Sequence, residues 1–134
     1  KAAALLGKVK LAHFLLAFGL MVASAGHCQE HLARPEQLKV TGVGSEPHPM
    51  TEACRSFTLT ARQAAAYFET AMIIDVFEEH DHYAWAPCWV RGTARVNKKR
   101  VSWKIRAGLT ARVVFPNGDV ILLADPSQRL SGEE

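Results

Sequence analysis

Strict alternation of apolar and polar residues between positions 88 and 107 constrains the fold of this chain more than any other feature of its sequence. Cationic or polar residues alternate with apolar ones on both sides of a basic turn at residues 97–100. The residues expected on the covered side are Val90, Gly92, Ala94, Val96, Val101, Trp103, Ile105 and Ala107. A period of two is typical of antiparallel strands with one face covered and the other in water. The pattern therefore predicts a β-hairpin within an antiparallel sheet.

Two more strands are expected to extend this hairpin into a meander. Gly108 breaks the alternation, and residues 111–115 then form a third strand. Asn117-Gly118 predicts a hairpin turn into a fourth strand over residues 120–124. Two registers stay open, because a type I turn that contains Pro116 and a bulge at the glycine would shift the pairing by one residue. That shift would exchange the faces of the fourth strand.

An amphipathic helix is predicted before the sheet. Thr60 and Gln63 have the spacing of a capping box, in which a hydroxyl and an amide side chain satisfy unpaired backbone groups at a helix start. The apolar stripe of this helix comprises Ala64, Tyr67, Phe68, Ala71 and Ile74. We expect the helix to end near Asp75 or Val76. The predicted fold class is α+β, with one amphipathic helix packed on a four-stranded antiparallel meander.

The first 25 residues are expected to be a signal peptide. Three lysines precede an uncharged run over residues 11–23, and Ala23-Ser24-Ala25 has the small-residue pattern that signal peptidase cleaves. The alternative is a membrane anchor or a buried helix, but the thirteen residues of the run would reach only about 20 Å across a hydrocarbon core of about 30 Å. We therefore expect a periplasmic or secreted protein whose mature chain starts near Gly26 and has no membrane span.

The rest of the chain is predicted to divide into three parts. Prolines and glycines interrupt every apolar period in residues 26–53, which predicts an extended tether or an arm laid on the domain. Residues 38–43 are a candidate short edge strand within it. Residues 54–126 are expected to form the compact domain, and residues 127–134 a flexible tail.

Charge is segregated along the chain. The full sequence has 16 Lys and Arg against 13 Asp and Glu, but Lys1, Lys8 and Lys10 lie in the expected leader, so the mature chain is neutral. Residues 88–116 contain eight cations and no carboxylate, whereas the segments before and after them are acidic. A neutral protein with one cationic segment favours an oriented, salt-sensitive encounter over indiscriminate adhesion.

Three cysteines suit an oxidising compartment. Cys54 precedes the helix and Cys88 opens the sheet, so a disulfide between them would tie together the two flanks of the helix. Three cysteines allow three single bridges, of which we favour Cys54 with Cys88, and Cys28 is left over. The alternative is a catalytic thiol at Cys88 with His80 or His82 as its base, but no Cys-centred catalytic signature surrounds it.

The densest group of polar side chains follows the helix, in what we expect to be a loop. His80, Asp81 and His82 offer ligands that suit zinc or copper, but such a site usually needs three or four protein ligands and only this stretch is dense. Glu78 and Glu79 make a poor acid/base pair, because adjacent positions do not face each other across a substrate. Phosphate-loop and Gly-x-Ser-x-Gly motifs are missing from the sequence. We therefore expect no cofactor and no catalytic residue.

The outer face of the sheet is the most informative surface. If the alternation holds, it carries Trp89, Arg91, Arg95, Lys104, Arg106 and Arg112, with residues 98–100 at its rim. Arginine and tryptophan concentrate binding energy in protein interfaces, so this composition predicts a docking surface for an acidic protein. The alternative is a solvated strand face that carries one tryptophan. Nucleic acid is not the expected partner, since an exported protein meets little of it and only Trp89 is placed to stack on a base.

A set of short motifs runs through residues 57–124. They are Phe57-Thr58-Leu59-Thr60, His82-Tyr83, Trp85-Ala86-Pro87-Cys88, Gly92-Thr93-Ala94, Trp103-Lys104-Ile105 and Gly108. The set resembles a group of small exported proteins of Gram-negative bacteria with no established activity. This resemblance implies export and the shape of the domain, and it carries over no catalytic residue. Where those proteins usually have a second glycine beside Gly108 this chain has Leu109, and where they often have a cysteine it has Ala124-Asp125.

These features together predict a non-catalytic periplasmic binding module that docks an acidic protein, as an inhibitor or immunity-type partner of a secreted enzyme does. Two other functions stay open. A small metal-binding protein or metal-dependent enzyme would use His80 and His82. A structural component of the cell envelope would use the proline-rich tether and an unpaired Cys28.

Overall fold

The computed structural model describes residues 30–47 and 54–131 of the chain. The predicted signal peptide, its cleavage site and Cys28 lie outside these residues. The elements are β1 (Glu36–Ser45), α1 (Ala61–Thr70), β2 (Met72–Ile74), α2 (Val76–His82), β3 (Cys88–Val96), β4 (Lys99–Arg106), β5 (Thr110–Val114) and β6 (Val120–Ala124). A short 3-10 helix at Pro126–Gln128 follows β6. Among the described residues, no helix is long and apolar enough to span a bilayer.

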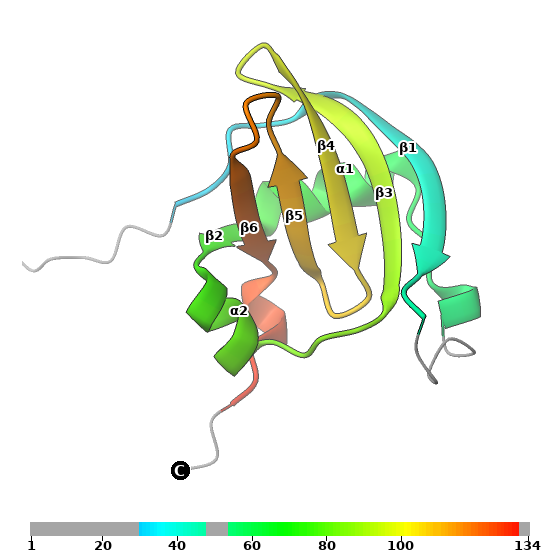
Figure 1. Cartoon of the computed structure of the whole chain (residues 1–134), viewed down its shortest axis with the longest axis vertical. Helices are drawn as coiled ribbons and strands as arrows, with labels where there is room; N and C mark the ends of the chain where they lie inside the picture. The colour runs from blue at the N-terminus through cyan, green and yellow to red at the C-terminus, as the bar shows by residue number, and fades with distance from the viewer. Residues whose placement is uncertain (1–29, 48–53, 132–134) are drawn as a thin grey trace, which may run out of the picture.

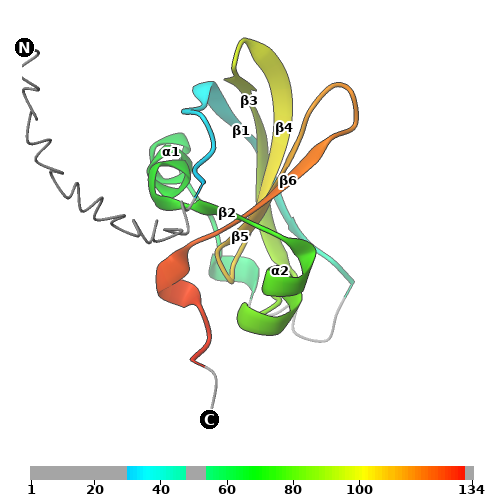
Figure 2. The ribbon, with the colours of Figure 1, turned by 90° about the vertical axis from the view of Figure 1, so that its left-hand side faces the viewer.

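The six strands form one antiparallel sheet in the order β1-β3-β4-β5-β6-β2 (Figure 1). Helix α1 lies against one side of this sheet. On the other side, which we call the outer face, no helix among the described residues covers the central strands (Figure 2). The α+β class is confirmed. The predicted count of four strands and one helix is wrong, because β1 and β2 extend the sheet at both edges and α2 is a second helix.

The central hairpin has the predicted alternation. Buried and accessible residues alternate along β3 from Cys88 to Val96 and continue into β4. Asn97 and Lys98 both have positive φ angles, of 50° and 65°, and they form the two-residue turn between Val96 and its partner Lys99. Positive φ at both central positions matches the right-handed twist of the two strands.

The open register of the last hairpin is settled in favour of the bulged turn. The amide of Gly118 donates to the carbonyl of Phe115 at 3.0 Å, and Val114 pairs with Val120. Gly118 has a φ of 91°, the left-handed conformation that the bulge requires. Val120 therefore accompanies Val114 on the outer face, and Leu123 lies in the core.

Helix α1 starts as predicted and ends earlier. The amide of Gln63 donates to Thr60 Oγ1 at 3.1 Å, and the amide of Thr60 donates to Gln63 Oε1 at 2.9 Å, which completes the capping box. The helix ends at Thr70, whereas it was expected to continue to about Asp75. Met72–Ile74 instead forms β2, because three consecutive apolar residues, two of them β-branched, pair well with the edge of β6.

The polar stretch after β2 is a helix, and its prediction as a loop is wrong. Asp75 is the N-cap of α2, and its side chain accepts a hydrogen bond from the amide of Glu78 at 2.8 Å. Two glutamates lie in the first turn, where negative charge interacts favourably with the helix dipole. These local terms stabilise a helix of only seven residues.

Part of the predicted tether belongs to the sheet. Strand β1 covers the candidate edge strand and is longer, and Leu32 before it is buried with 8% of its surface exposed. The strand is irregular, with register shifts between Glu36 and Lys39 and again between Val40 and Gly42. A side chain in place of Gly92 would overlap the carbonyl of Lys39 and the ring of Trp103, so glycine lets the two strands approach closely.

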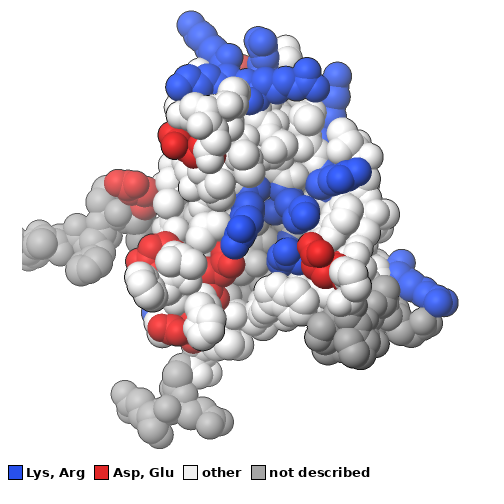
Figure 3. All heavy atoms as spheres, viewed as in Figure 1, with Lys and Arg blue, Asp and Glu red and all other residues white. Residues whose placement is uncertain are grey.

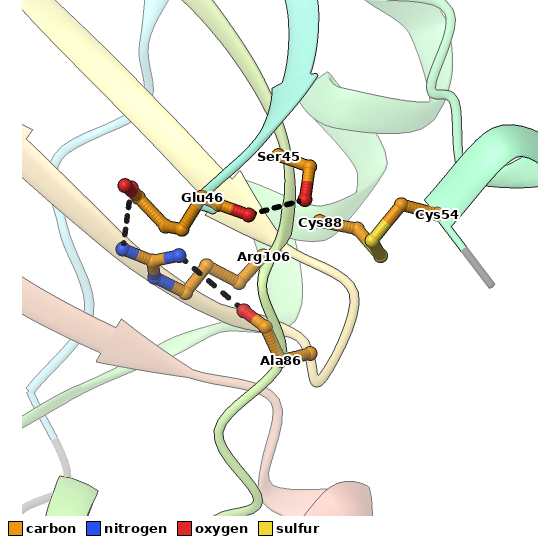
Figure 4. The surroundings of a disulfide bond; sticks show 6 residues. All are labelled: Ser45, Glu46, Cys54, Ala86, Cys88 and Arg106. Atoms are coloured by element: carbon orange, nitrogen blue, oxygen red, sulfur yellow. Dashed lines mark hydrogen bonds and ion pairs between the residues drawn. A yellow bond between two sulfur atoms is a disulfide. The ribbon is translucent and has the colours of Figure 1, made fainter. Parts of the chain in front are cut away.

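The core lies between α1 and the sheet, and a disulfide closes one end of it. Phe68 packs edge-on against Trp103, with ring centroids 5.7 Å apart. Cys54 and Cys88 are bonded to each other, with their Cα atoms 5.0 Å apart (Figure 4). This confirms the predicted disulfide. It also leaves no thiol at Cys88 to act as a nucleophile.

Candidate binding face

Strand pairing brings the predicted binding residues together on the outer face. Arg91 of β3 lies opposite Lys104 of β4, and Lys104 lies opposite Arg112 of β5, so three cations form a row across three strands. Trp89 lies opposite Arg106 beside this row. Seen from the outer side, Lys and Arg side chains gather over these central strands and around the β3–β4 turn (Figure 3). We call Arg91, Lys104 and Arg112 the cationic row.

Like charges on directly opposed positions of a sheet destabilise it. The cationic row contains two such pairs in succession, Arg91 with Lys104 and Lys104 with Arg112. Two carboxylates from other elements partly offset the repulsion, and the sequence alone gave no indication of either. They are Glu46, which follows β1, and Glu79, which belongs to α2.

Glu46 contacts the β4 side of the face. Its Oε1 atom is 3.8 Å from Lys104 Nζ and 3.4 Å from Arg106 Nη2. Arg106 also donates to the carbonyl of Ala86 at 3.3 Å (Figure 4). Its guanidinium lies over the ring of Trp85, 5.6 Å from the centroid. Only 20% of the Arg106 side chain is exposed. Arg106 therefore braces the loop before β3 and is a weaker candidate for contact with a partner than the cationic row.

Glu79 contacts the β5 end of the row. Its Oε1 atom lies 3.6 Å from Arg112 Nη2, and 56% of the Arg112 side chain remains exposed. Exposed ion pairs at such distances contribute little stability, typically below about 1 kcal/mol. The Arg112 guanidinium is thus available to another anion.

The ring of Trp89 lies beneath two side chains of the cationic row. A side chain at Gly44 would collide with the ring of Trp89, so this ring lies directly against the backbone of β1. Arg91 and Lys104 lie over the same ring, 5.3 and 4.7 Å from its centroid. These cation–π contacts each contribute about 0.5–1 kcal/mol at an accessible site. They hold two cations of the row close to the sheet.

A hollow of about 420 Å³ lies beside the cationic row. The row forms part of its wall, and Thr93, Ser102 and Val114 form another part. Thr93 pairs with Ser102, and Ser102 pairs with Val114. Each of these residues is two positions along its strand from a cation of the row. Cations, hydroxyl groups and an aliphatic side chain thus surround one concave site.

Arg95 lies apart from this hollow. It pairs with Arg100 near the β3–β4 turn, where both residues line a second hollow of about 390 Å³ together with Gln37, Lys39 and Thr41. Arg95 is on the same face as the cationic row, but a small ligand in the first hollow would not contact it, since Arg95 is not among its lining residues.

The candidate metal ligands lie on a helix and not in the expected loop. His80, Asp81 and His82 lie on α2, where residues two apart do not face each other. His80 Nδ1 lies 2.9 Å from Asp81 Oδ1, and the side chain of His80 is 88% exposed. Within residues 30–47 and 54–131, no three His, Cys, Asp or Glu side chains are grouped so that they could hold a metal ion.

Comparison of the chain with protein-family models, curated proteins and solved structures gave no match. The fold and the outer face therefore define the candidate site by themselves. They describe a small disulfide-bonded α+β domain with a cationic hollow on the open side of its sheet.

Proposed function

We propose that this protein is an exported, non-catalytic binding module that docks an acidic protein through the outer face of its sheet. The observation that carries the proposal is the cationic row, in which strand register aligns three positive side chains beside a concave site. Opposed like charges whose repulsion is only partly offset break a rule of stability, and such exceptions are characteristic of functional sites. The predicted leader and the disulfide support the exported location.

The chemistry of the face fits a protein partner. Arginine offers planar donors that match carboxylate groups, and it is enriched where interfaces concentrate binding energy. The cations on this face also create a positive potential that speeds association with an acidic surface and weakens as salt rises. An inhibitor or immunity-type protein needs such a steered encounter with its secreted target.

The experiment that tests the proposal is partner capture by matched triple variants. Arg91→Ser, Lys104→Ser and Arg112→Ser together remove the cationic row. Arg34→Ser, Arg62→Ser and Arg129→Ser remove the same formal charge elsewhere on the described surface. Each variant is immobilised and exposed to native periplasmic extract, and bound proteins are quantified by mass spectrometry.

The expected result is an acidic protein bound by the wild type and by the control variant but bound at least about tenfold less by the row variant, which corresponds to about 1.4 kcal/mol. The thermal midpoints of both variants should stay close to that of the wild type, because the row variant loses two weak cation–π contacts but is also relieved of the repulsion between opposed cations. Equal capture by the row variant at physiological salt would contradict the proposal.

A further inference from the structure

The outer face is ordered into two parallel rows of side chains with different chemistry. The cationic row is followed, two residues along each strand, by a second row of Thr93, Ser102, Val114 and Val120. Two residues of strand span about 6.6 Å. Hydroxyl groups on β3 and β4 and valine side chains on β5 and β6 therefore lie within the length of a small organic acid from the cations.

The protein already places its own carboxylates on the cationic row. Glu46 and Glu79 approach from its two flanks, at 3.8 Å from Lys104 and 3.6 Å from Arg112. Both distances exceed those of strong charge-assisted hydrogen bonds, which are about 2.7–2.9 Å. Arg91 makes no ion pair within the part of the chain that the structure describes. The row thus accepts carboxylates but holds its internal ones loosely.

The valine side chains beside the cations are accessible. Val114 is 38% exposed and Val120 is 50% exposed, although both lie within a sheet whose inner face is well covered. Val114 also lines the hollow, whose 420 Å³ falls within the range of small-ligand sites. An anion without an apolar portion would leave these side chains in water.

We propose that the hollow is a recognition pocket for a carboxylate that carries an aliphatic group. The carboxylate binds the cationic row, displaces Glu46 and Glu79, and places its aliphatic portion against Val114, which lines the hollow. This assignment rests on the proposed function, which supplies the partner: an acidic segment in which an acidic side chain or terminal carboxylate adjoins an aliphatic one. The internal glutamates then compete with the partner and keep the row partly neutral when it is empty.

Titration with small acids tests the pocket without any partner protein. Hexanoate, acetate and inorganic phosphate are added separately to the 15N-labelled chain, and amide chemical shifts are recorded. Hexanoate should produce saturable shifts at Arg91, Ser102 and Val114. Its Kd should be about tenfold lower than that of acetate, because its four additional carbons are partly buried.

Four variants assign the contacts. Arg91→Ser with Arg112→Ser should abolish hexanoate binding, while Arg34→Ser with Arg62→Ser should leave it unchanged. Val114→Ser should remove the preference for hexanoate over acetate. Glu46→Gln with Glu79→Gln should lower the Kd for hexanoate about threefold, because two competing carboxylates are removed. All seven substituted positions are accessible or half-accessible, so dispersed spectra should confirm that each of the four variants is folded.

Three outcomes would overturn the assignment: no saturable shift with hexanoate, equal affinities for hexanoate and acetate, or tighter binding of phosphate than of hexanoate. These outcomes are separable from failure of the proposed function. Loss of partner capture in the row variant together with no hexanoate binding leaves the docking function standing and rejects the pocket. Hexanoate binding without capture of any acidic protein supports the pocket and rejects the docking function.

Discussion

Tyr67 connects α1 to the β4–β5 turn through one buried hydroxyl. The hydroxyl donates to the carbonyl of Leu109 at 2.8 Å, and only 7% of the residue is exposed. Burial, reinforced by the negative charge of Asp125, raises the pKa of Tyr67 well above its usual range. Leu109 at this turn has a φ of 59°, an unfavourable angle for leucine, so the hydrogen bond helps to hold a strained residue.

This pKa shift predicts a loss of stability at high pH. Above about pH 10 the unfolded chain releases the phenol proton while the folded chain keeps it, so the free energy of unfolding should fall by up to about 1.4 kcal/mol per pH unit from this group. Tyr67→Phe should cost about 1 kcal/mol near neutral pH, where a hydrogen bond is lost, and should remove that slope. Denaturant unfolding of the wild type and of Tyr67→Phe between about pH 8 and 11 measures how the free energy of unfolding changes with pH. Parallel curves would show that Tyr67 is not the group responsible.

Lys98 is exposed and has a strained backbone conformation. Its φ of 65° lies in the left-handed region, and the two-residue turn that it forms with Asn97 usually has glycine at this second position. Lys98→Gly should therefore stabilise the protein by about 0.5–1 kcal/mol. Lys98→Ala is the control, because it removes the same charge and keeps the Cβ atom. Equal unfolding free energies for the two variants would attribute any gain to charge alone.

Strand β2 and helix α2, which follow Thr70, show which parts of the fold sequence patterns could predict and which they could not. The central hairpin, α1 and the disulfide followed from periodicity, a capping box and cysteine spacing, all of which are local signals. Strand β2 exists because it pairs with β6, about fifty residues further along the chain, and a helix-like spacing at Ile74 concealed it. The cap of α2 was present in the sequence as Asp75 followed three residues later by Glu78, the spacing of a capping box.

The candidate site divides in the same way. Strand alternation was enough to predict which cations share the outer face, because the period of two fixes the side of the sheet. The contacts of Glu46 and Glu79 depend on where β1 and α2 pack. An edge strand was expected over residues 38–43 but without its place beside β3, and α2 was not expected at all. Trp89 was predicted as a partner contact, but its packing on Gly44 also gives it a supporting function that depends on β1.

Asp75 allows the contribution of α2 to be measured separately. Asp75→Ala removes the side chain that caps the amide of Glu78 and should cost about 1 kcal/mol locally. Faster hydrogen exchange should appear at the amides of α2 and leave the central strands unchanged. Asp81→Ala, in the last turn of the same helix, is the matched control and should not accelerate exchange. Protection of α2 unchanged by Asp75→Ala would mean that packing alone holds this helix.

The molecule combines a covered inner face with an outer face that is open between two flanking elements. The end of β1 brings Glu46 to one side of the cationic row, and α2 brings Glu79 to the other. The disulfide acts at the first of these places, because Cys88 pairs with Ser45 immediately before Glu46. The cross-link therefore stabilises the fold and also restrains one border of the candidate site (Figure 4).

Removal of the disulfide should consequently affect both the fold and the site. The bond joins residues 34 positions apart, for which the loss of cross-link entropy predicts about 3–4 kcal/mol of destabilisation. Cys54→Ser with Cys88→Ser, made in a Cys28→Ser background to prevent thiol exchange, should show this loss in denaturant unfolding. Amide shifts at Glu46 and Arg106 should also change, whereas those of α1 should change little.

Chemical reduction supplies the control for this experiment. A reductant should destabilise the Cys28→Ser protein by the same amount as the two cysteine substitutions do, because each treatment removes only the cross-link. The variant that lacks all three cysteines should be unaffected by the reductant. An unfolding free energy within about 1 kcal/mol of the parent would show that packing of α1 on the sheet suffices to hold the domain. Unchanged shifts at Glu46 would show that strand pairing, rather than the cross-link, fixes this border of the hollow.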